Sequence, residues 1–135
     1  MLSKAAPEIR EQILFILNDR DDPTIVGGNH WSLLVFDRGS ARFEYYDSMR
    51  PAKDAIARQL VNTIKPVLGA PEVSFVIVEC PQQRNSFDCG MYVIEFVRHQ
   101  LKLAEESYSL GISSSYIESE RQHWQDVIIS LSKTQ

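Results

Sequence analysis

Apolar residues gather in short blocks along the first eighty positions of the chain, separated by polar or glycine-containing segments. Blocks of this length with such boundaries favour strands. The predicted strands are residues 12–17 (QILFIL), 30–36 (HWSLLVF), 42–47 (RFEYYD) and 73–78 (VSFVIV). The turn DRGS separates the second strand from the third, so Trp31–Asp47 is predicted to form a hairpin. PEIREQ, which overlaps the start of the first strand, is predicted to begin a short helix, and NDRDDPTIVGG is predicted to be a loop.

Helical spacing appears first in residues 52–68. Apolar residues recur there every four positions, at Ile56, Leu60 and Ile64. This period predicts a helix with one buried face. Pro66 is expected to end or kink the helix, and Gly69 follows just beyond.

Two further helical patterns fill the last third of the chain. The first runs from Cys89 to about Glu106 and is apolar on most sides, so it is predicted to be largely buried. Its solvated stripe consists of Glu95, Arg98, His99, Lys102, Glu105 and Glu106. The second runs from about Tyr116 to Ser132, with an apolar side formed by Ile117, Trp124, Val127, Ile128 and Leu131. Strands first, and then a strand between helices, indicate an α+β fold more than alternating βαβ units.

Composition excludes several classes of protein. The 135 residues suit one domain, and an apolar fraction of 44% is ordinary for a globular chain. The net charge of −4 argues against general nucleic-acid binding, which needs a basic surface. The longest apolar runs are too short to span a membrane, and the first ten residues lack the apolar core of a signal peptide. Two cysteines do not form a disulfide framework, which indicates a reducing compartment, the cytosol or the nucleus.

The stretch CPQQRNSFDCGMY, residues 80–92, places Cys89 where a polar loop becomes a helix. Unpaired N–H groups and the helix dipole favour an anion at such a position. Helix N-termini together with a cationic histidine lower thiol pKa values from about 8.5 to roughly 3.5–7.5. Cys89 is therefore a candidate nucleophile. Cys80, at the end of an apolar strand before Pro81, is predicted to be a packing residue.

A thiolate nucleophile needs a base, and the base needs an orienting group. His30 opens the second predicted strand and Asp47 closes the third, so the hairpin can bring them together. Gln83, six residues before Cys89, is a candidate oxyanion donor, with the backbone N–H of Cys89 as a second donor. All four residues lie at element ends or in loops, where catalytic groups usually occur. The cysteines and histidines lack paired metal-ligand spacing, so neither a metal nor another cofactor is expected.

Three segments carry a family resemblance: GGNHWSLLVF, FEYYDS and PQQRNSFDCGMYVI. They resemble the ubiquitin-like protease, or sentrin-specific protease, family of cysteine proteases, whose pattern is His-Trp, then Asp, then Gln and Asp-Cys-Gly. The matching positions are His30, Trp31, Asp47, Gln83, Asp88, Cys89 and Gly90. The resemblance is strongest to the deneddylase branch, including its last helix (SYIESERQHWQDVIISLSK), and it covers roughly residues 8–133.

This resemblance implies a papain-like fold of the adenoviral-protease and ubiquitin-like-protease type. It implies cleavage after the Gly-Gly tail of a ubiquitin-like modifier, of the neddylation type first and SUMO second. Cys89 would attack the last glycine carbonyl, His30 would transfer protons, Asp47 would orient His30, and Gln83 would stabilise the oxyanion. Family domains carry a further amino-terminal segment, so residues 1–135 are expected to be one catalytic domain that is amino-terminally truncated relative to the family.

Other residues receive weaker assignments. Trp31, Asn29 and Asp88 are the expected substrate contacts, and for Asp88 a helix N-cap role is an equal alternative. Arg84 is a further loop residue that is able to reach substrate, and His99 and His123 are predicted to lie on helix surfaces. The acidic run Asp19, Asp21 and Asp22 is predicted to be a solvated loop. Alternatives for the whole chain are a desumoylating protease, a catalytically impaired modifier-binding module, and an acetyltransferase on a related scaffold.

Overall fold

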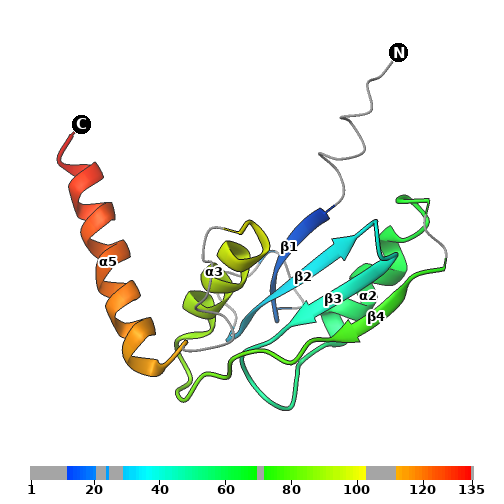
Figure 1. The fold of residues 1–135 in the computed structure, drawn as a ribbon, viewed down its shortest axis with the longest axis horizontal. Coiled ribbons are helices and arrows are strands. Elements are labelled where there is room, and N and C mark those ends of the chain that lie inside the picture. Colours follow the sequence, from blue (N-terminus) through cyan, green and yellow to red (C-terminus); the bar gives the residue numbers. More distant parts are fainter. Residues whose placement is uncertain (1–11, 21–23, 25–28, 70–71, 103–111, 135) are drawn as a thin grey trace.

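The computed structural model describes residues 12–20, 24, 29–69, 72–102 and 112–134. In this part of the chain, four strands form one mixed sheet in the order β1-β2-β3-β4 (Figure 1). The strands are β1 (Gln12–Asn18), β2 (Trp31–Asp37), β3 (Arg42–Tyr46) and β4 (Ser74–Ile77). β1 and β3 flank β2 in antiparallel pairs, and β4 runs parallel to β3. The four predicted strands and the hairpin are confirmed. Of PEIREQ, Gln12 opens β1 rather than a helix, and the other residues lie outside the described part.

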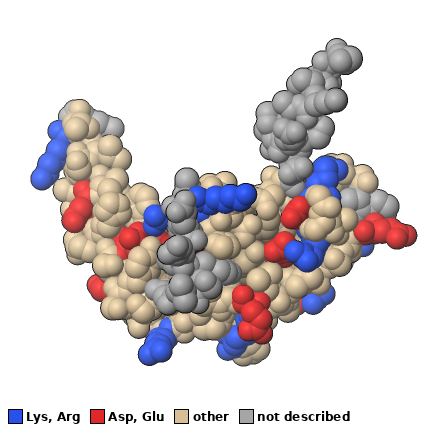
Figure 2. Space-filling model, viewed as in Figure 1, with Lys and Arg blue, Asp and Glu red and all other residues tan. Residues whose placement is uncertain are grey.

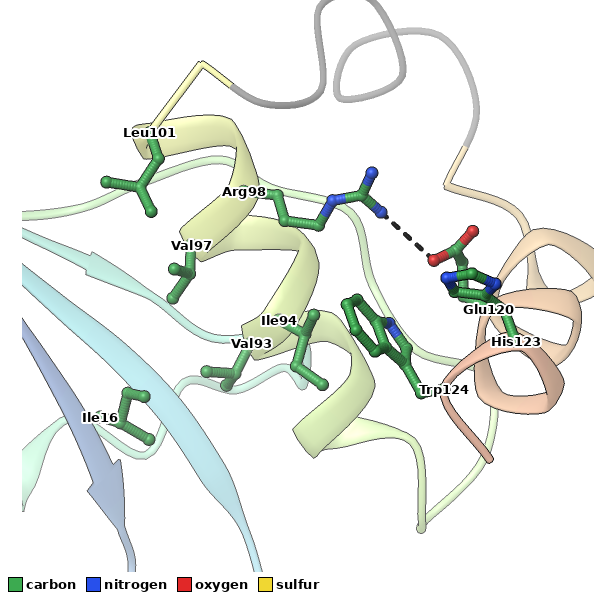
Figure 3. A pocket seen from close by; sticks show the side chains of 9 residues that line it. All are labelled: Ile16, Val93, Ile94, Val97, Arg98, Leu101, Glu120, His123 and Trp124. Atoms are coloured by element: carbon green, nitrogen blue, oxygen red, sulfur yellow. Dashed lines mark hydrogen bonds and ion pairs between the residues drawn. The ribbon is translucent and has the colours of Figure 1, made fainter. Parts of the chain in front are cut away.

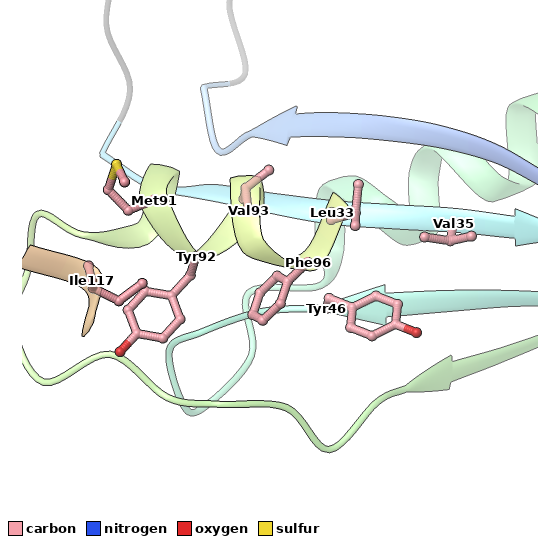
Figure 4. Close-up of a cluster of buried hydrophobic side chains, with 8 residues drawn as sticks. All are labelled: Leu33, Val35, Tyr46, Met91, Tyr92, Val93, Phe96 and Ile117. Carbon is pink, nitrogen blue, oxygen red and sulfur yellow. The ribbon is translucent and has the colours of Figure 1, made fainter. Parts of the chain in front are cut away.

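Helices pack on both faces of the sheet at β2, whose successive side chains point to opposite sides. Leu33 and Val35 of β2 join a cluster with side chains of the helix that follows Asp88 (Figure 4). Leu34 and Phe36 point the other way, into a second cluster under the helix between β3 and β4. Burial on both sides explains why residues 33–36 of β2 form an unbroken apolar run.

The helix between β3 and β4 is α2 (Ala55–Ile64), which is shorter than the predicted span of residues 52–68. At its start, the backbone N–H of Lys53 donates to the Asp47 carboxylate and its carbonyl accepts from Tyr45, so the residues before Ala55 are held outside the helix. At its end, Pro66 has no N–H to continue the ladder, and Gly69 adopts a left-handed φ of 64°. The predicted position was right and the predicted ends were too wide.

The helix that begins at the candidate nucleophile is α3 (Cys89–Gln100). Lys102 has a left-handed φ of 57°, so the helix stops before the predicted end at Glu106, and residues 103–106 lie outside the described part. The predicted solvated stripe was wrong at Glu95, whose surface is only 1% exposed. Glu95 is buried because Arg98 pairs with one of its carboxylate oxygens and Tyr116 donates to the other.

The last helix, α5 (Ser114–Ser132), packs on α3 near its own N-terminus and extends away from the sheet (Figure 1). Ser113 caps it by accepting the backbone N–H of Tyr116. Ile117 is fully buried, but Ile128 and Leu131 are exposed, so the predicted apolar side is covered only over the first part of the helix. The reason is geometric, since α5 runs past the end of the surface that α3 offers.

Charged side chains of both signs are interspersed on the face shown in Figure 2, and they do not gather into one basic surface there. Among the described helices, none combines the length and the apolarity that crossing a membrane requires. Strands and helices are mixed without a regular βαβ alternation, which confirms the predicted α+β class.

Candidate active site

His30 and Asp47 meet at one end of the sheet, where β2 begins and β3 has just ended. His30 Nε2 lies 2.6 Å from Asp47 Oδ1, and both side chains are almost completely buried. The hairpin register accounts for this contact, because Leu33 of β2 is paired with Tyr46 of β3. The predicted proximity of the two residues is present in the structure.

Both carboxylate oxygens of Asp47 accept hydrogen bonds. Its carboxylate accepts from His30, from the backbone N–H groups of Met49 (2.9 Å) and Lys53 (2.8 Å), and from the hydroxyl of Tyr45 (3.2 Å). Burial alone would raise the pKa of Asp47, but the hydrogen bonds from His30, Lys53 and Met49 outweigh it and hold the pKa below its ordinary value. The carboxylate therefore remains an anion that is able to orient the imidazole.

The backbone carbonyl of Asp47 is also saturated. It accepts from Arg50 Nη1 at 2.8 Å, from Gln82 Nε2 at 2.9 Å and from Cys80 Sγ at 3.3 Å. Burial raises the pKa of the Cys80 thiol, so that this cysteine is the less ionised kind of thiol at neutral pH. Its half-buried position against the core agrees with the predicted packing role.

The imidazole of His30 has one nitrogen left for chemistry. Because a carboxylate only accepts, the contact with Asp47 places a proton on Nε2. Nδ1 is buried and has no hydrogen-bond partner among the described residues. In the neutral imidazole, Nδ1 is the acceptor nitrogen, which is the atom that a general base uses.

Cys89 is the first residue of α3, as predicted, and only 5% of its surface is exposed. Its neighbour Gly90 faces the residue that follows His30, since a β-carbon at position 90 would lie 3.9 Å from Cδ1 of the Trp31 indole. The start of β2 and the first turn of α3 are thus in contact. This contact brings the histidine end of the hairpin to the thiol end of the helix.

Gln83 is fixed to the same end of the sheet. Its backbone N–H donates to the carbonyl of Ser48 at 2.7 Å, and its side-chain oxygen accepts from the Ser48 hydroxyl at 2.5 Å. Its side-chain nitrogen donates one hydrogen to the Asn85 carbonyl at 2.5 Å. The second hydrogen of that amide has no acceptor among the described residues, so it is able to donate to an oxyanion.

The expected substrate contacts differ in their accessibility. Trp31 is 43% exposed, and Asn29 and Arg84 are exposed loop residues. Asp88 is 3% exposed and occupies the N-cap position of α3 without a side-chain capping bond. Its carboxylate instead pairs with Arg121 and accepts from Asn85. The N-cap position considered for Asp88 is therefore confirmed, although its side chain does not cap the helix.

Asp19 belongs to the site, although the sequence indicated a solvated loop. Its Oδ1 accepts the backbone N–H groups of Asn29 at 2.8 Å and His30 at 3.0 Å, and its own N–H donates to the carbonyl of His30 at 3.1 Å. The ammonium of Lys53 lies 3.9 Å from its other oxygen. Asp19 therefore fixes the backbone of the candidate base.

No local sequence signal predicted this contact of Asp19, because it joins residues eleven positions apart across a loop. Asp21 and Asp22 lie outside the described residues.

Replacing Asp19 by alanine is expected to lower the free energy of unfolding by about 1.5–3 kcal/mol, because two N–H groups lose a charged acceptor. Asp19→Asn keeps an acceptor oxygen and is expected to recover most of that loss. Urea unfolding of the two variants measures the difference, with Asp54→Ala as the control, since Asp54 pairs with exposed Arg58. Equal losses in Asp19→Ala and Asp19→Asn would show that the charge facing Lys53, and not the acceptor, matters.

A groove of about 480 Å³ lies elsewhere. It is formed between α3, α5 and the exposed side of β1 (Figure 3), and none of its lining residues is a predicted site residue. His123 and Trp124 line it, together with the ion pair between Arg98 and Glu120. In the part of the chain that the structure describes, no group of three or more histidine, cysteine or carboxylate side chains is placed to hold a metal ion.

The chain is similar to several known proteins. Sentrin-specific protease 8 of Homo sapiens is 32% identical over 133 residues, which cover 91% of this chain and 61% of that protein. NEDD8-specific protease 1 of Arabidopsis thaliana is 32% identical over 94 residues, covering 67% of this chain and 42% of that one. The solved structure of the SUMO protease Ulp1 with its catalytic cysteine oxidised to a sulfonic acid aligns with a TM-score of 0.55 at 20% identity, covering 68% of this chain and 43% of that chain.

The structural likeness confirms the predicted Ulp1-type protease fold. The chain spans 61% of the length of the human relative. A family model described as "Ulp1 protease family, C-terminal catalytic domain" matches residues 12–133, nearly the whole sequence. The chain belongs to the Ulp1 protease family.

Proposed function

We propose that this chain is a cysteine isopeptidase that cleaves after the Gly-Gly tail of a ubiquitin-like modifier, with NEDD8 as the preferred modifier. One observation carries the proposal. His30 is oriented by Asp47 through Nε2, and its Nδ1 is left without a partner among the described residues. This orphan nitrogen belongs to the end of β2 that contacts the first turn of α3, where Cys89 lies.

The reaction follows from these positions. His30 Nδ1 takes the proton of the Cys89 thiol, and the sulfur attacks the carbonyl carbon of the terminal glycine. The oxyanion that forms is stabilised by the free N–H of Gln83 and by the start of α3. When the amide C–N bond breaks, His30 gives its proton to the leaving amine, which leaves a thioester on Cys89. Water, deprotonated by His30, then attacks the thioester and releases the modifier with a free carboxylate.

The choice of NEDD8 rests on the relatives. NEDD8-specific protease 1 is named for that modifier, while the solved Ulp1 structure is a SUMO protease and supports the fold alone. Desumoylation is therefore the second candidate. Exposed Trp31 beside Gly90 is suited to line a channel for glycines, which lack the β-carbon that a narrow channel would exclude. We propose a cytosolic or nuclear location, because the two cysteines of the chain do not form a disulfide framework.

The test uses NEDD8 whose carboxyl end carries a thiol-reactive electrophile, mixed with this chain and with its Cys89→Ala variant. A covalent adduct that is absent from Cys89→Ala is the expected result, read by mass spectrometry. SUMO and ubiquitin probes run in parallel, and slower labelling by both is expected. Faster labelling by SUMO would move the assignment to desumoylation. A folded chain that binds NEDD8 but forms no adduct would be a binding module, contrary to the proposal.

A further inference from the structure

The carboxylate next to the candidate nucleophile is buried and already occupied. Asp88 directly precedes Cys89, and both its oxygens have partners. One oxygen forms an ion pair with Arg121, and the other accepts from Asn85 Nδ2 at 2.7 Å. A carboxylate held in this way is unsuited to meet a substrate. It is suited to fix the backbone on which Cys89 lies.

The same contacts extend to the candidate oxyanion donor. Asn85 Oδ1 accepts the backbone N–H groups of Phe87 and Asp88, at 3.1 Å and 3.0 Å. The carbonyl of Asn85 accepts from Gln83 Nε2. Residues 83–88 therefore form one hydrogen-bonded loop that joins Gln83 to the start of α3.

Among the described residues, Arg121 is the one member of this network that comes from α5. It reaches the loop from 33 positions further along the chain and lies 5.7 Å from the ring centroid of Phe87. Arg121 thus supplies a cation from a late helix to the buried carboxylate beside the candidate nucleophile. We infer that Arg121 is a positioning residue that acts through Asp88 to hold the Cys89 turn in its reactive arrangement. The inference rests on the proposed role of Cys89.

The charge of Asp88 determines whether removing Arg121 raises or lowers the reactivity of Cys89. If Arg121 is removed, the buried carboxylate of Asp88 loses its cationic partner and keeps only the hydrogen bond from the neutral amide of Asn85. An uncompensated negative charge next to Cys89 disfavours a second anion at the sulfur. Removing the Asp88 charge as well relieves this repulsion. The inference therefore predicts that Asp88→Asn suppresses the defect of Arg121→Ala.

The experiment measures how fast iodoacetamide modifies Cys89 between about pH 5 and 9, by peptide mass spectrometry of the folded chain. Cys80 in the same molecule serves as the reference thiol. Arg121→Ala is expected to slow Cys89 modification roughly three- to tenfold at neutral pH and to shift the rise of the Cys89 rate to higher pH. The modification rate of Cys80 is expected to stay unchanged. Arg121→Lys, which keeps the positive charge, and Arg121→Ala/Asp88→Asn are both expected to recover most of the rate.

Glu120→Ala is the matched control, because it breaks the other ion pair from α5 to α3 and leaves Asp88 untouched. Its Cys89 profile is expected to equal that of the unmodified chain. A similar slowing in Glu120→Ala, or a double variant as slow as Arg121→Ala, would assign the effect to docking of α5 and overturn the inference. Circular dichroism establishes that each variant is folded, and Arg121→Gln, which removes the charge but keeps most of the side chain, carries the test with the same expected slowing if Arg121→Ala is not folded. A chain that reacts with no modifier probe but shows these profiles would contradict the proposed function alone.

Discussion

Replacing His30 by alanine is expected to slow iodoacetamide modification of Cys89 about 10- to 30-fold at pH 7. An ordinary thiol with a pKa near 8.5 is only a few per cent ionised at that pH, whereas a thiol paired with a histidine is largely thiolate. Cleavage of a NEDD8 derivative with a fluorescent amide at its carboxyl end is expected to fall further, by about 10²–10⁴ in kcat/KM, because His30 also protonates the leaving amine. Quenched labelling time courses measure the modification rate, and the fluorescent assay measures the cleavage rate.

Cys80 provides the internal reference for this prediction, since it contacts the Asp47 carbonyl and not the imidazole. Its modification rate is expected to be the same in both proteins. Equal Cys89 rates in the unmodified chain and in His30→Ala would show that the two residues do not pair. Cys89→Ala is the control for cleavage, and residual turnover in that variant would assign the chemistry to another group.

Replacing Asp47 by alanine is expected to lower the free energy of unfolding by about 3–5 kcal/mol, and turnover of the NEDD8 derivative by about 10⁴. The stability loss arises because His30, Met49 and Lys53 would keep buried or partly buried donors without their acceptor, whereas Tyr45 would keep the Lys53 carbonyl. The loss of turnover arises because nothing then fixes the tautomer of His30. Chemical denaturation and the fluorescent assay measure the two losses.

The pH dependence of the unfolding free energy separates the contribution of the Asp47 charge from the contribution of its side-chain shape. Hydrogen bonds lower the pKa of Asp47 in the folded state, so its carboxylate contributes stability above the ordinary aspartate value of about 3.9. That contribution is lost as the pH falls below this value, through the lower folded-state pKa. Asp47→Asn cannot titrate, and it presents an amide N–H to one pair of donors. The difference in unfolding free energy between the unmodified chain and Asp47→Asn is therefore expected to shrink in acid. A constant difference from pH 7 to about pH 3 would contradict this account.

Strand positions were predictable because burial acts on each strand locally. The run from Leu33 to Phe36 is apolar on both sides, and both sides are covered in the structure. Helix ends were less predictable, because tertiary contacts set them. The Asp47 carboxylate accepts the backbone N–H of Lys53 and keeps that residue outside α2. The periodicity within residues 52–68 does not predict this hydrogen bond, because Asp47 lies outside that segment.

Buried charge was the least visible feature in the sequence. Glu95 has the spacing of a solvated stripe, yet it is buried because Arg98 and Tyr116 satisfy its two oxygens. Asp19 has the appearance of a loop acid, yet it anchors the backbone of His30. In each case the partner that offsets the cost of burial comes from another part of the chain, or from a helix face that the pattern alone does not orient.

By itself, the sequence determined the α+β class, the hairpin that joins His30 to Asp47, and the placement of Cys89 at the start of a helix. These depend on periodicity, on turn residues and on chain order, which are local properties. Only the tertiary structure decided that Asp88 is occupied by Arg121 and Asn85, and that Asp19 fixes His30. Such contacts depend on which buried donors and acceptors meet when distant segments pack, and the free energy that selects them exists only in the assembled fold.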